Sequence, residues 1–328
     1  MKKDTLVNIG VSVAAIFAVL LISELMFRFA WNPGDWGRGP MYRRNGNPYL
    51  RYELIPGASY EQVKVNPQGF RGPERSFKKP ANTYRILILG DSETLCLLVP
   101  EKDTLAARLE GLLNQGSKNL RYEVLNFGVE GYNTFQELEQ LKIKGLQYDP
   151  DLIILNYCIN DPEPGELYFE KTFLMRHSAL VRYINWRIKK TMIKAERKRL
   201  KIKTEVDHYN YLYQPESFGR AAKVIQEMAD IAKKRGNKLV LFFFPCSSVE
   251  VKDFHQKYPY WTMHALVKNI PSDNILFIDP INEFNRLGLT PPQVCITETQ
   301  EESHKNAAAQ KVLADYLYAV LIDTHTVP

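Results

Sequence analysis

Short apolar runs alternate with longer amphipathic stretches along most of the chain. Five of these runs read as strands buried on both faces: Arg85–Leu89, Glu123–Phe127, Leu152–Asn156, Leu239–Phe244 and Ile275–Ile278. Between or after them, apolar residues recur at helical spacing over Thr104–Gln115, Thr134–Gly145, Ser217–Arg235 and Asn306–Ile322. Strands that alternate with helices predict a parallel sheet with right-handed crossovers and helices on both faces. The expected fold is therefore α/β, a three-layer α/β/α domain with a five-stranded parallel sheet.

A different pattern opens the chain. Leu6–Ser23 contains no charged residue, and the apolar character continues to Trp31. About 20 helical residues cross the hydrocarbon core of a bilayer, so this run predicts one N-terminal transmembrane helix. A cleaved signal peptide and a buried helix are the alternatives. The run is longer than a usual signal-peptide core and lacks a small-x-small site just after it, which favours an uncleaved anchor.

The flanking charges and the composition suggest how the rest is organised. Lys2 and Lys3 favour a short cytoplasmic N-terminus, which makes the protein single-pass with the main domain outside the cytoplasm. We expect an anchor over 1–31, an irregular Gly- and Pro-rich linker arm over 32–80, and the α/β domain over 81–328. A helical insertion interrupts this domain at about 164–215.

That insertion carries most of the positive charge. Eleven basic residues and one acid, Glu196, lie within Arg176–Lys203, whereas the whole chain has a net charge of only +6. Four apolar positions there have near-helical spacing: Leu180, Ile184, Ile188 and Met192. A solvated basic face, contact with anionic lipid headgroups and nucleic-acid binding would each explain the charge. No nucleic-acid-binding motif accompanies it, so we expect no nucleic-acid partner.

The overall composition narrows the class of protein. With 45% hydrophobic and 12% aromatic residues the chain can build a large core, and its single long apolar run excludes a polytopic membrane protein. The four cysteines form no C-x-x-C pair, and no His, Asp and Glu cluster has metal-ligand spacing. We therefore expect no metal and no cofactor. The cysteines are either buried thiols or, outside the cytoplasm, disulfide-bonded.

Candidate chemistry follows the predicted strands. Ser92 comes directly after the first strand, Gly131 after the second and Asn160 after the third, while Glu301 and His304 precede the last helix. Sites in open α/β sheets form beyond the carboxyl ends of the strands, so these groups should meet at one edge. Each could instead have a local role, such as a helix cap, a turn glycine or an Asx turn.

The order of these motifs resembles the SGNH (GDSL-type) hydrolase family. The blocks are Ile88-Leu89-Gly90-Asp91-Ser92, Gly131, Asn160 and His304, and the likeness covers about residues 81–325. The preceding stretch Asn66–Gly72 is similar to that of membrane-anchored bacterial members. The resemblance implies a flavodoxin-like SGNH fold and a serine ester hydrolase.

The resemblance also implies a role for each residue. His304 accepts the proton of Ser92, which attacks an ester carbonyl and forms an acyl-enzyme, and Glu301 holds the His304 ring. The oxyanion hole consists of the Ser92 and Gly131 N–H groups and the Asn160 side-chain amide. The implied substrate is an acylated small molecule or glycan.

Two departures from the family pattern keep other functions open. Glu301 stands where the family usually has Asp, and Glu93 follows the nucleophile directly. Either change could lower or alter activity. The alternatives are an O-acyltransferase acting on a surface or exported polysaccharide, and a catalytically inactive binding protein with the same cleft.

Overall fold

The computed structural model divides the chain into two compact units. One comprises Met1–Gly39 with Tyr168–Lys203, and the other comprises Pro40–Leu167 with Thr204–Pro328. The structure describes residues 3–30, 41–47, 49–50, 52–163, 174, 177–297, 300 and 303–328.

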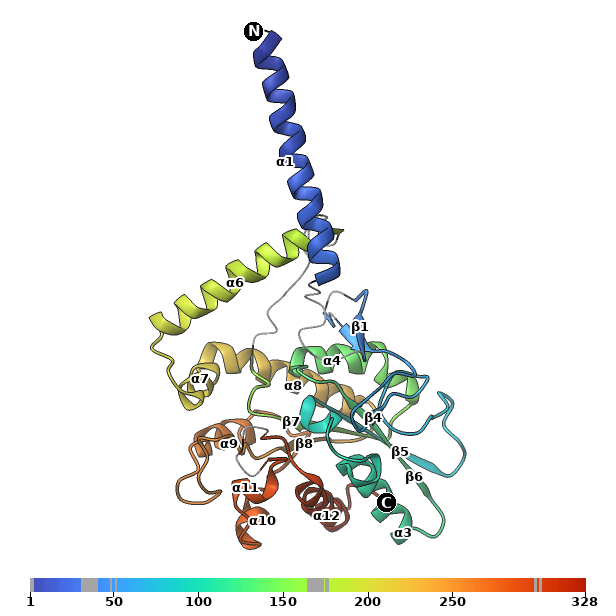
Figure 1. The fold of residues 1–328 in the computed structure, drawn as a ribbon. Helices are drawn as coiled ribbons and strands as arrows, with labels where there is room; N and C mark the ends of the chain where they lie inside the picture. The colour runs from blue at the N-terminus through green and yellow to red at the C-terminus, as the bar shows by residue number, and fades with distance from the viewer. Residues whose placement is uncertain are drawn as a thin grey trace. The chain divides into compact units, whose positions relative to one another are not determined.

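A five-stranded parallel sheet forms the centre of the larger unit (Figure 1) and confirms the predicted fold class. The spatial order is β6-β5-β7-β8-β9. The strands are β5 (Thr83–Gly90), β6 (Arg121–Gly128), β7 (Leu152–Tyr157), β8 (Leu239–Phe243) and β9 (Ile275–Ile278). Every residue of β7 and β8 is buried, as continuous apolar runs predict for strands covered on both faces.

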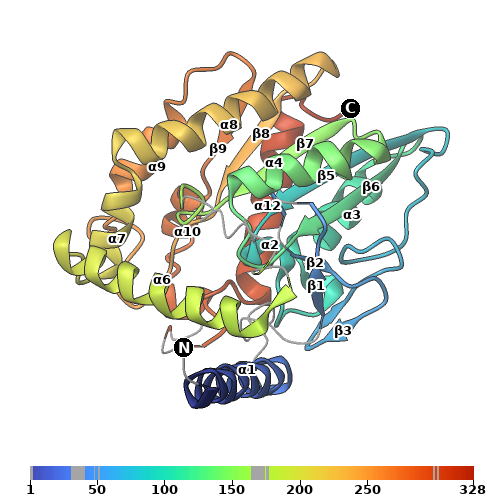
Figure 2. The same cartoon turned by 90° about the horizontal axis from the view of Figure 1, so that it is seen from above.

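Helices cover both faces of this sheet. The contacting pair α3 (Leu105–Gly116) and α12 (Ala307–Asp323) lies on one face, and the pair α4 (Thr134–Ile143) and α8 (Pro215–Lys234) lies on the other (Figures 1 and 2). The shorter helices are α2 (Ser92–Leu95), α7 (Glu205–Leu212), α9 (Trp261–Lys268), α10 (Ile281–Arg286) and α11 (Pro291–Val294), with 3-10 turns at Glu101–Asp103 and Gly145–Tyr148. These layers complete the predicted three-layer arrangement.

Side-chain caps explain where three of the helices begin. Thr104 precedes α3, Asn133 precedes α4 and Asn306 precedes α12. Each side-chain oxygen accepts a hydrogen bond from a backbone N–H of the first helical turn, which would otherwise lack a partner. Two of these caps, Asn133 and Asn306, lie within two residues of the candidate site residues Gly131 and His304.

The described part of the N-terminal arm packs onto the α/β domain. It forms two small antiparallel sheets, β1 (Tyr42–Arg44) with β2 (Tyr52–Leu54) and β3 (Ser59–Tyr60) with β4 (Val63–Lys64). Apolar residues of these sheets form a second core with Leu95, Val129 and Tyr132, which flank the candidate site. Arg71, which is fully buried, donates hydrogen bonds to the carbonyls of Leu95, Cys96 and Val99. The arm therefore supports the loop that follows Ser92.

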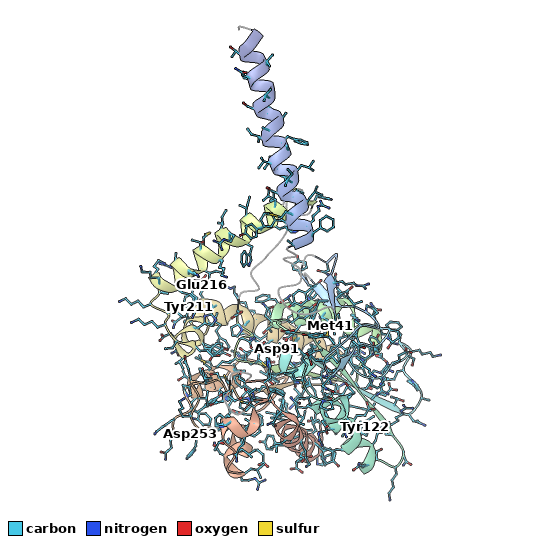
Figure 3. All side chains as sticks on the ribbon, in the orientation of Figure 1. Met41, Asp91, Tyr122, Tyr211, Glu216 and Asp253 are labelled. Carbon is cyan, nitrogen blue, oxygen red and sulfur yellow. The ribbon has the colours of Figure 1, made fainter. Side chains whose placement is uncertain are left out.

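Two helices of the smaller unit are described, α1 (Lys3–Ala30) and α6 (Ala179–Arg199). Within α1, Val7–Ala30 is long and apolar enough to cross a membrane, with a mean hydropathy of 2.3. Its side chains point outward on all sides (Figure 3), and it is hydrophobic all round rather than on one stripe. That distribution suits a lipid environment better than the surface of a globular domain. A signal sequence near the N-terminus would share these properties.

Candidate active site

The register of the sheet brings the ends of three strands together. Gly90 at the end of β5 pairs with Gly128 of β6 on one side and with Asn156 of β7 on the other. The segments carrying Ser92, Gly131 and Asn160 therefore leave the sheet at the same edge, where sites form in open α/β folds.

Close packing beneath Ser92 requires glycine at two positions. A Cβ atom at Gly90 would lie 2.1 Å from the Thr94 hydroxyl oxygen, and one at Gly128 would lie 2.4 Å from the Leu95 backbone nitrogen. The turn between β5 and α2 is thus pressed directly against the two strands. Asp91 caps α2 by accepting a hydrogen bond from the Glu93 N–H at 2.9 Å. Ser92 is the first residue of α2.

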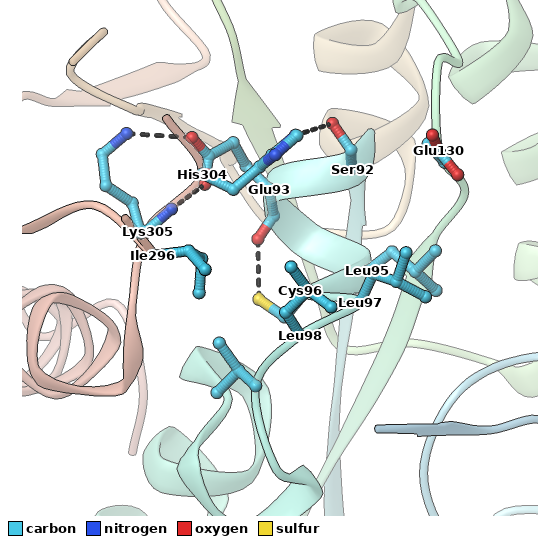
Figure 4. Close-up of a pocket in the computed structure, with 11 residues that line it drawn as sticks. Ser92, Glu93, Leu95, Cys96, Leu97, Leu98, Glu130, Ile296, His304 and Lys305 are labelled. Atoms are coloured by element: carbon cyan, nitrogen blue, oxygen red, sulfur yellow. Dashed lines mark hydrogen bonds and ion pairs between the residues drawn. The ribbon is translucent and has the colours of Figure 1, made fainter. Parts of the chain in front are cut away.

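Ser92 and His304 are in hydrogen-bond contact, although 212 residues separate them in sequence. The distance from Ser92 Oγ to His304 Nε2 is 2.7 Å (Figure 4). With the imidazole neutral and its proton on Nδ1, Nε2 accepts the hydroxyl proton. This is the arrangement in which a histidine activates a serine as a nucleophile.

A short backbone bridge holds the His304 loop. Ile296 N–H donates to the His304 carbonyl at 2.9 Å, and Cys295 pairs with Lys305. Asn306 N–H donates to the Val294 carbonyl at 2.9 Å, immediately before α12 begins. Backbone hydrogen bonds on both sides of His304 therefore hold it in place.

Glu93 connects this segment to the turn that carries Ser92. Its carboxylate accepts a hydrogen bond from the Lys305 backbone N–H at 3.0 Å and pairs with Lys305 Nζ at 2.9 Å (Figure 4). The Lys305 side chain is 1% exposed and the Glu93 side chain 14%. Burial alone would lower the pKa of Lys305, but the adjacent Glu93 carboxylate raises it above its ordinary value, so the amine stays charged. Glu93 thus binds the residue that follows His304.

Asp91 orients the Asn160 side chain. Asn160 Nδ2 donates to Asp91 Oδ2 at 3.2 Å, and Cys158 Sγ donates to Asp91 Oδ1 at 3.2 Å. Burial raises the pKa of Asp91, and the hydrogen bond from Glu93 N–H opposes this rise. Asp91 lies in the densely packed interior of the domain (Figure 3). The second Nδ2 hydrogen of Asn160 can serve a substrate oxygen.

Gly131 lies in the exposed turn between β6 and α4. Its φ of +68° is in the left-handed region, which glycine adopts without strain. Tyr52 O–H donates to the neighbouring Glu130 carbonyl at 2.6 Å, so the N-terminal arm fixes this turn. The acid predicted for the His304 ring, Glu301, lies outside the described residues, and its role stays a prediction.

Sequence reasoning missed two buried carboxyl groups near the site. Glu137 of α4 and Asp161 after β7 are fully buried, and three of their four oxygens have no partner among the described residues. Burial raises the pKa of both groups, and each is raised further by the other or by Asp91. Within the part of the chain that the structure describes, no group of three or more His, Cys, Asp or Glu could hold a metal ion. In the sequence, only the nearness of Glu137 to Asn133 and of Asp161 to Asn160 could have drawn attention to these two carboxyl groups.

A small, largely apolar pocket opens beside Ser92 and His304. Its volume is about 70 Å³. Besides the Glu93–Lys305 pair and Glu130, its lining consists of Leu95, Cys96, Leu97, Leu98, Val99 and Ile296 (Figure 4).

All four cysteines of the chain are described, and no disulfide joins any two of them. Cys96 and Cys158 therefore lie near the site as thiols.

Comparison with known proteins gives structural likeness without sequence likeness. No protein-family model matches the chain, and no curated protein matches it by sequence. Three similar solved structures each align with 72% of the chain. They are the acetyl xylan esterase AlAXEase (14% identity, 99% of that chain, TM-score 0.45), a catalytic mutant of the acetylxylan esterase Axe2 from Geobacillus stearothermophilus (17%, 93%, 0.46), and a protein from Desulfitobacterium hafniense assigned to the G-D-S-L family of lipolytic proteins (13%, 99%, 0.38).

Proposed function

We propose that this protein is a membrane-anchored serine ester hydrolase of the SGNH type that removes short acyl groups. The observation that carries the proposal is the 2.7 Å hydrogen bond between Ser92 Oγ and His304 Nε2 at the carboxyl edge of the sheet. Neither a capping role for Ser92 nor a surface role for His304 would explain a hydrogen bond between the two side chains. The apolar pocket beside this pair adds a place for the substrate.

The mechanism follows from the roles of the individual atoms. His304 Nε2 takes the Ser92 proton as Oγ attacks the ester carbonyl. The N–H groups of Ser92 and Gly131 and the Asn160 amide stabilise the oxyanion, and losing one such donor typically costs about 2.7–4 kcal/mol. His304 then returns the proton to the leaving alcohol, and water releases the acid from the acyl-enzyme. Glu301 is the proposed orienting acid for the His304 ring.

The pocket suggests which esters are hydrolysed. A volume of about 70 Å³ holds a few heavy atoms, whereas drug-sized ligands need about 300–1,000 Å³. The acyl group stays bonded to Ser92 Oγ after the alcohol leaves, so we assign this pocket to the acyl group. We propose that it holds a short acyl group such as acetyl or propionyl.

Turnover of a series of aryl esters by the full-length protein in detergent tests this proposal. We expect kcat/KM to be highest for 4-nitrophenyl acetate and to fall with chain length. Ser92→Ala should lower kcat by several powers of ten, because nucleophile and base act as a unit. A fluorophosphonate should label the wild type and spare Ser92→Ala. Equal labelling of both would refute the nucleophile, and acyl transfer to an added oligosaccharide instead of water would identify a transferase.

The proposed topology has the N-terminus in the cytoplasm and the catalytic domain outside. Lys2 and Lys3 before the apolar helix support this orientation. Protease added to intact spheroplasts should digest the larger unit. If the domain is protected until the membrane is permeabilised, the orientation is the reverse.

A further inference from the structure

Helix α6 combines many basic residues with exposed apolar residues, and the fold of a soluble domain requires neither. Its 21 residues include eight basic side chains and one acid, Glu196. Ile184, Ile188 and Met192 follow one another at four-residue spacing and are 48%, 54% and 63% exposed. Residues four apart lie on the same face of a helix, so an exposed apolar stripe runs along α6 between basic residues.

Helix α1 holds the N-terminus of α6. The Glu24 carboxylate accepts hydrogen bonds from Ser178 Oγ at 2.7 Å and from the N–H groups of Ala179 and Leu180 at 2.9 and 3.0 Å. These N–H groups open the helix and would otherwise lack partners, and a carboxylate is favourable at this end of a helix dipole. Phe27 of α1 stacks on Tyr183 with ring centroids 4.3 Å apart. The C-terminal part of α1 is therefore joined to the N-terminal end of α6.

The position of Glu24 along α1 sets the depth of this junction. Seventeen residues separate Val7, where the apolar span begins, from Glu24. At about 1.5 Å per residue this distance is about 26 Å, close to the thickness of the hydrocarbon core, which is about 30 Å. If α1 spans the bilayer, the junction lies at its outer boundary. Helix α6 leaves α1 there at a wide angle (Figures 1 and 2).

We propose that α6 lies on the bilayer surface beside α1 and binds anionic lipid headgroups. The apolar stripe fits the boundary between headgroups and acyl chains, and the basic side chains fit the phosphates. Trp186, with Lys190 Nζ 4.9 Å from its ring centre, has the amphipathic character of interfacial aromatic residues. The proposal depends on α1 spanning the membrane and is independent of the esterase activity.

Hydrogen exchange on the full chain in nanodiscs tests the proposal. We expect amides of α6 to exchange at least about tenfold more slowly in discs containing phosphatidylglycerol than in phosphatidylcholine discs, and high salt should reduce this difference. Amides of α12 should exchange equally in both and report that the domain is folded. Equal exchange of α6 in the two lipids would overturn the proposal. Slow exchange in both, insensitive to salt, would mean that α6 packs against the chain itself, which also overturns it.

Charge reversal separates the role of the basic residues from the shape of the helix. The variant combines Lys190→Glu, Lys194→Glu and Arg197→Glu, and its matched control places three reversals elsewhere, at Lys223→Glu, Lys234→Glu and Lys268→Glu, all exposed. We expect the first variant to lose the protection that phosphatidylglycerol gives and the control to keep it. Equal protection in both variants would refute binding through the α6 charges.

The depth of Trp186 gives a second measurement. Bromines placed high on the acyl chain should quench its fluorescence more strongly than bromines near the bilayer centre, because an interfacial helix inserts about 5–10 Å. Trp186→Phe assigns this contribution among the four tryptophans. No quenching from Trp186 at either depth would place α6 away from the lipid.

Discussion

Charged side chains have opposite surroundings in the two units. In the larger unit the buried cations have anionic partners: Lys305 pairs with Glu93 at 2.9 Å and Arg85 with Glu123 at 2.6 Å. In α6 eight basic residues accompany one acid, and most of them are exposed. A buried ion must be compensated, so each buried pair fixes two segments relative to one another. Exposed charges contribute little to stability, so the fold does not explain those of α6, for which we propose a lipid partner.

Removing the cation of the buried pair should produce the largest effect. Lys305→Met leaves the Glu93 carboxylate uncompensated, which we expect to lower the free energy of unfolding by about 3 kcal/mol. Turnover should fall about tenfold or more, because the segment carrying His304 loses an anchor. Urea unfolding and 4-nitrophenyl acetate hydrolysis measure the two effects. The control is Lys311→Met, which removes an exposed lysine paired with Asp315 on α12 and should cost no more than about 0.5 kcal/mol. Equal losses in both variants would contradict the comparison.

Replacing both members of the pair separates stability from positioning. In the double variant Glu93→Leu with Lys305→Met no buried charge is left alone, so much of the lost stability should return. The backbone N–H of Lys305 still lacks its acceptor, so kcat should stay low while KM changes little. A double variant with fully restored kcat would show that Glu93 has no role in positioning His304.

Buried carboxyl groups without a cationic partner should affect stability less than the buried Glu93–Lys305 pair and more than the exposed charges of α6. Burial raises the pKa of Glu137 and Asp161, so the folded protein binds more protons than the unfolded chain just above pH 4.5. The stability from these groups is therefore fully present at low pH and is lost as pH rises through their folded pKa values. Glu137→Gln should reduce this loss and raise Tm by about 3 °C at pH 8. A Tm profile between pH 5 and 9 with the same slope for both proteins would contradict this expectation.

The exposed charges of α6 should have the smallest effect on the enzyme. The triple reversal Lys190→Glu, Lys194→Glu and Arg197→Glu should change the free energy of unfolding by less than about 0.5 kcal/mol. Turnover of 4-nitrophenyl acetate in detergent should equal that of the wild type. A large loss of either would mean that these residues support the fold, and the contrast between the two units would disappear.

The sequence predicted the sheet well because continuous apolar runs have few alternatives to a buried strand. The strand Ile275–Ile278 has the predicted limits, and β5 begins two residues earlier and ends one residue later than expected. The contact between Ser92 and His304 followed from motif order. The Glu93–Lys305 pair has the same separation of 212 residues but could not be predicted, because no motif linked its members and either could have faced solvent. The capping of α6 by Glu24 likewise depends on a contact across 154 residues.

The few contacts that hold the His304 segment determine how the proposed activity should respond to heating. Cys295, Ile296, His304 and Lys305 are held by a backbone bridge and by Glu93, whereas the five-stranded sheet is held by a large apolar core. Regions with fewer buried contacts open at lower free energy than the core. Warming should therefore release this segment first and separate His304 from Ser92 while the sheet stays intact. Loss of the proposed activity would then begin below the melting temperature and reverse on cooling, because the Ser92–His304 contact would open and re-form while the sheet stays folded.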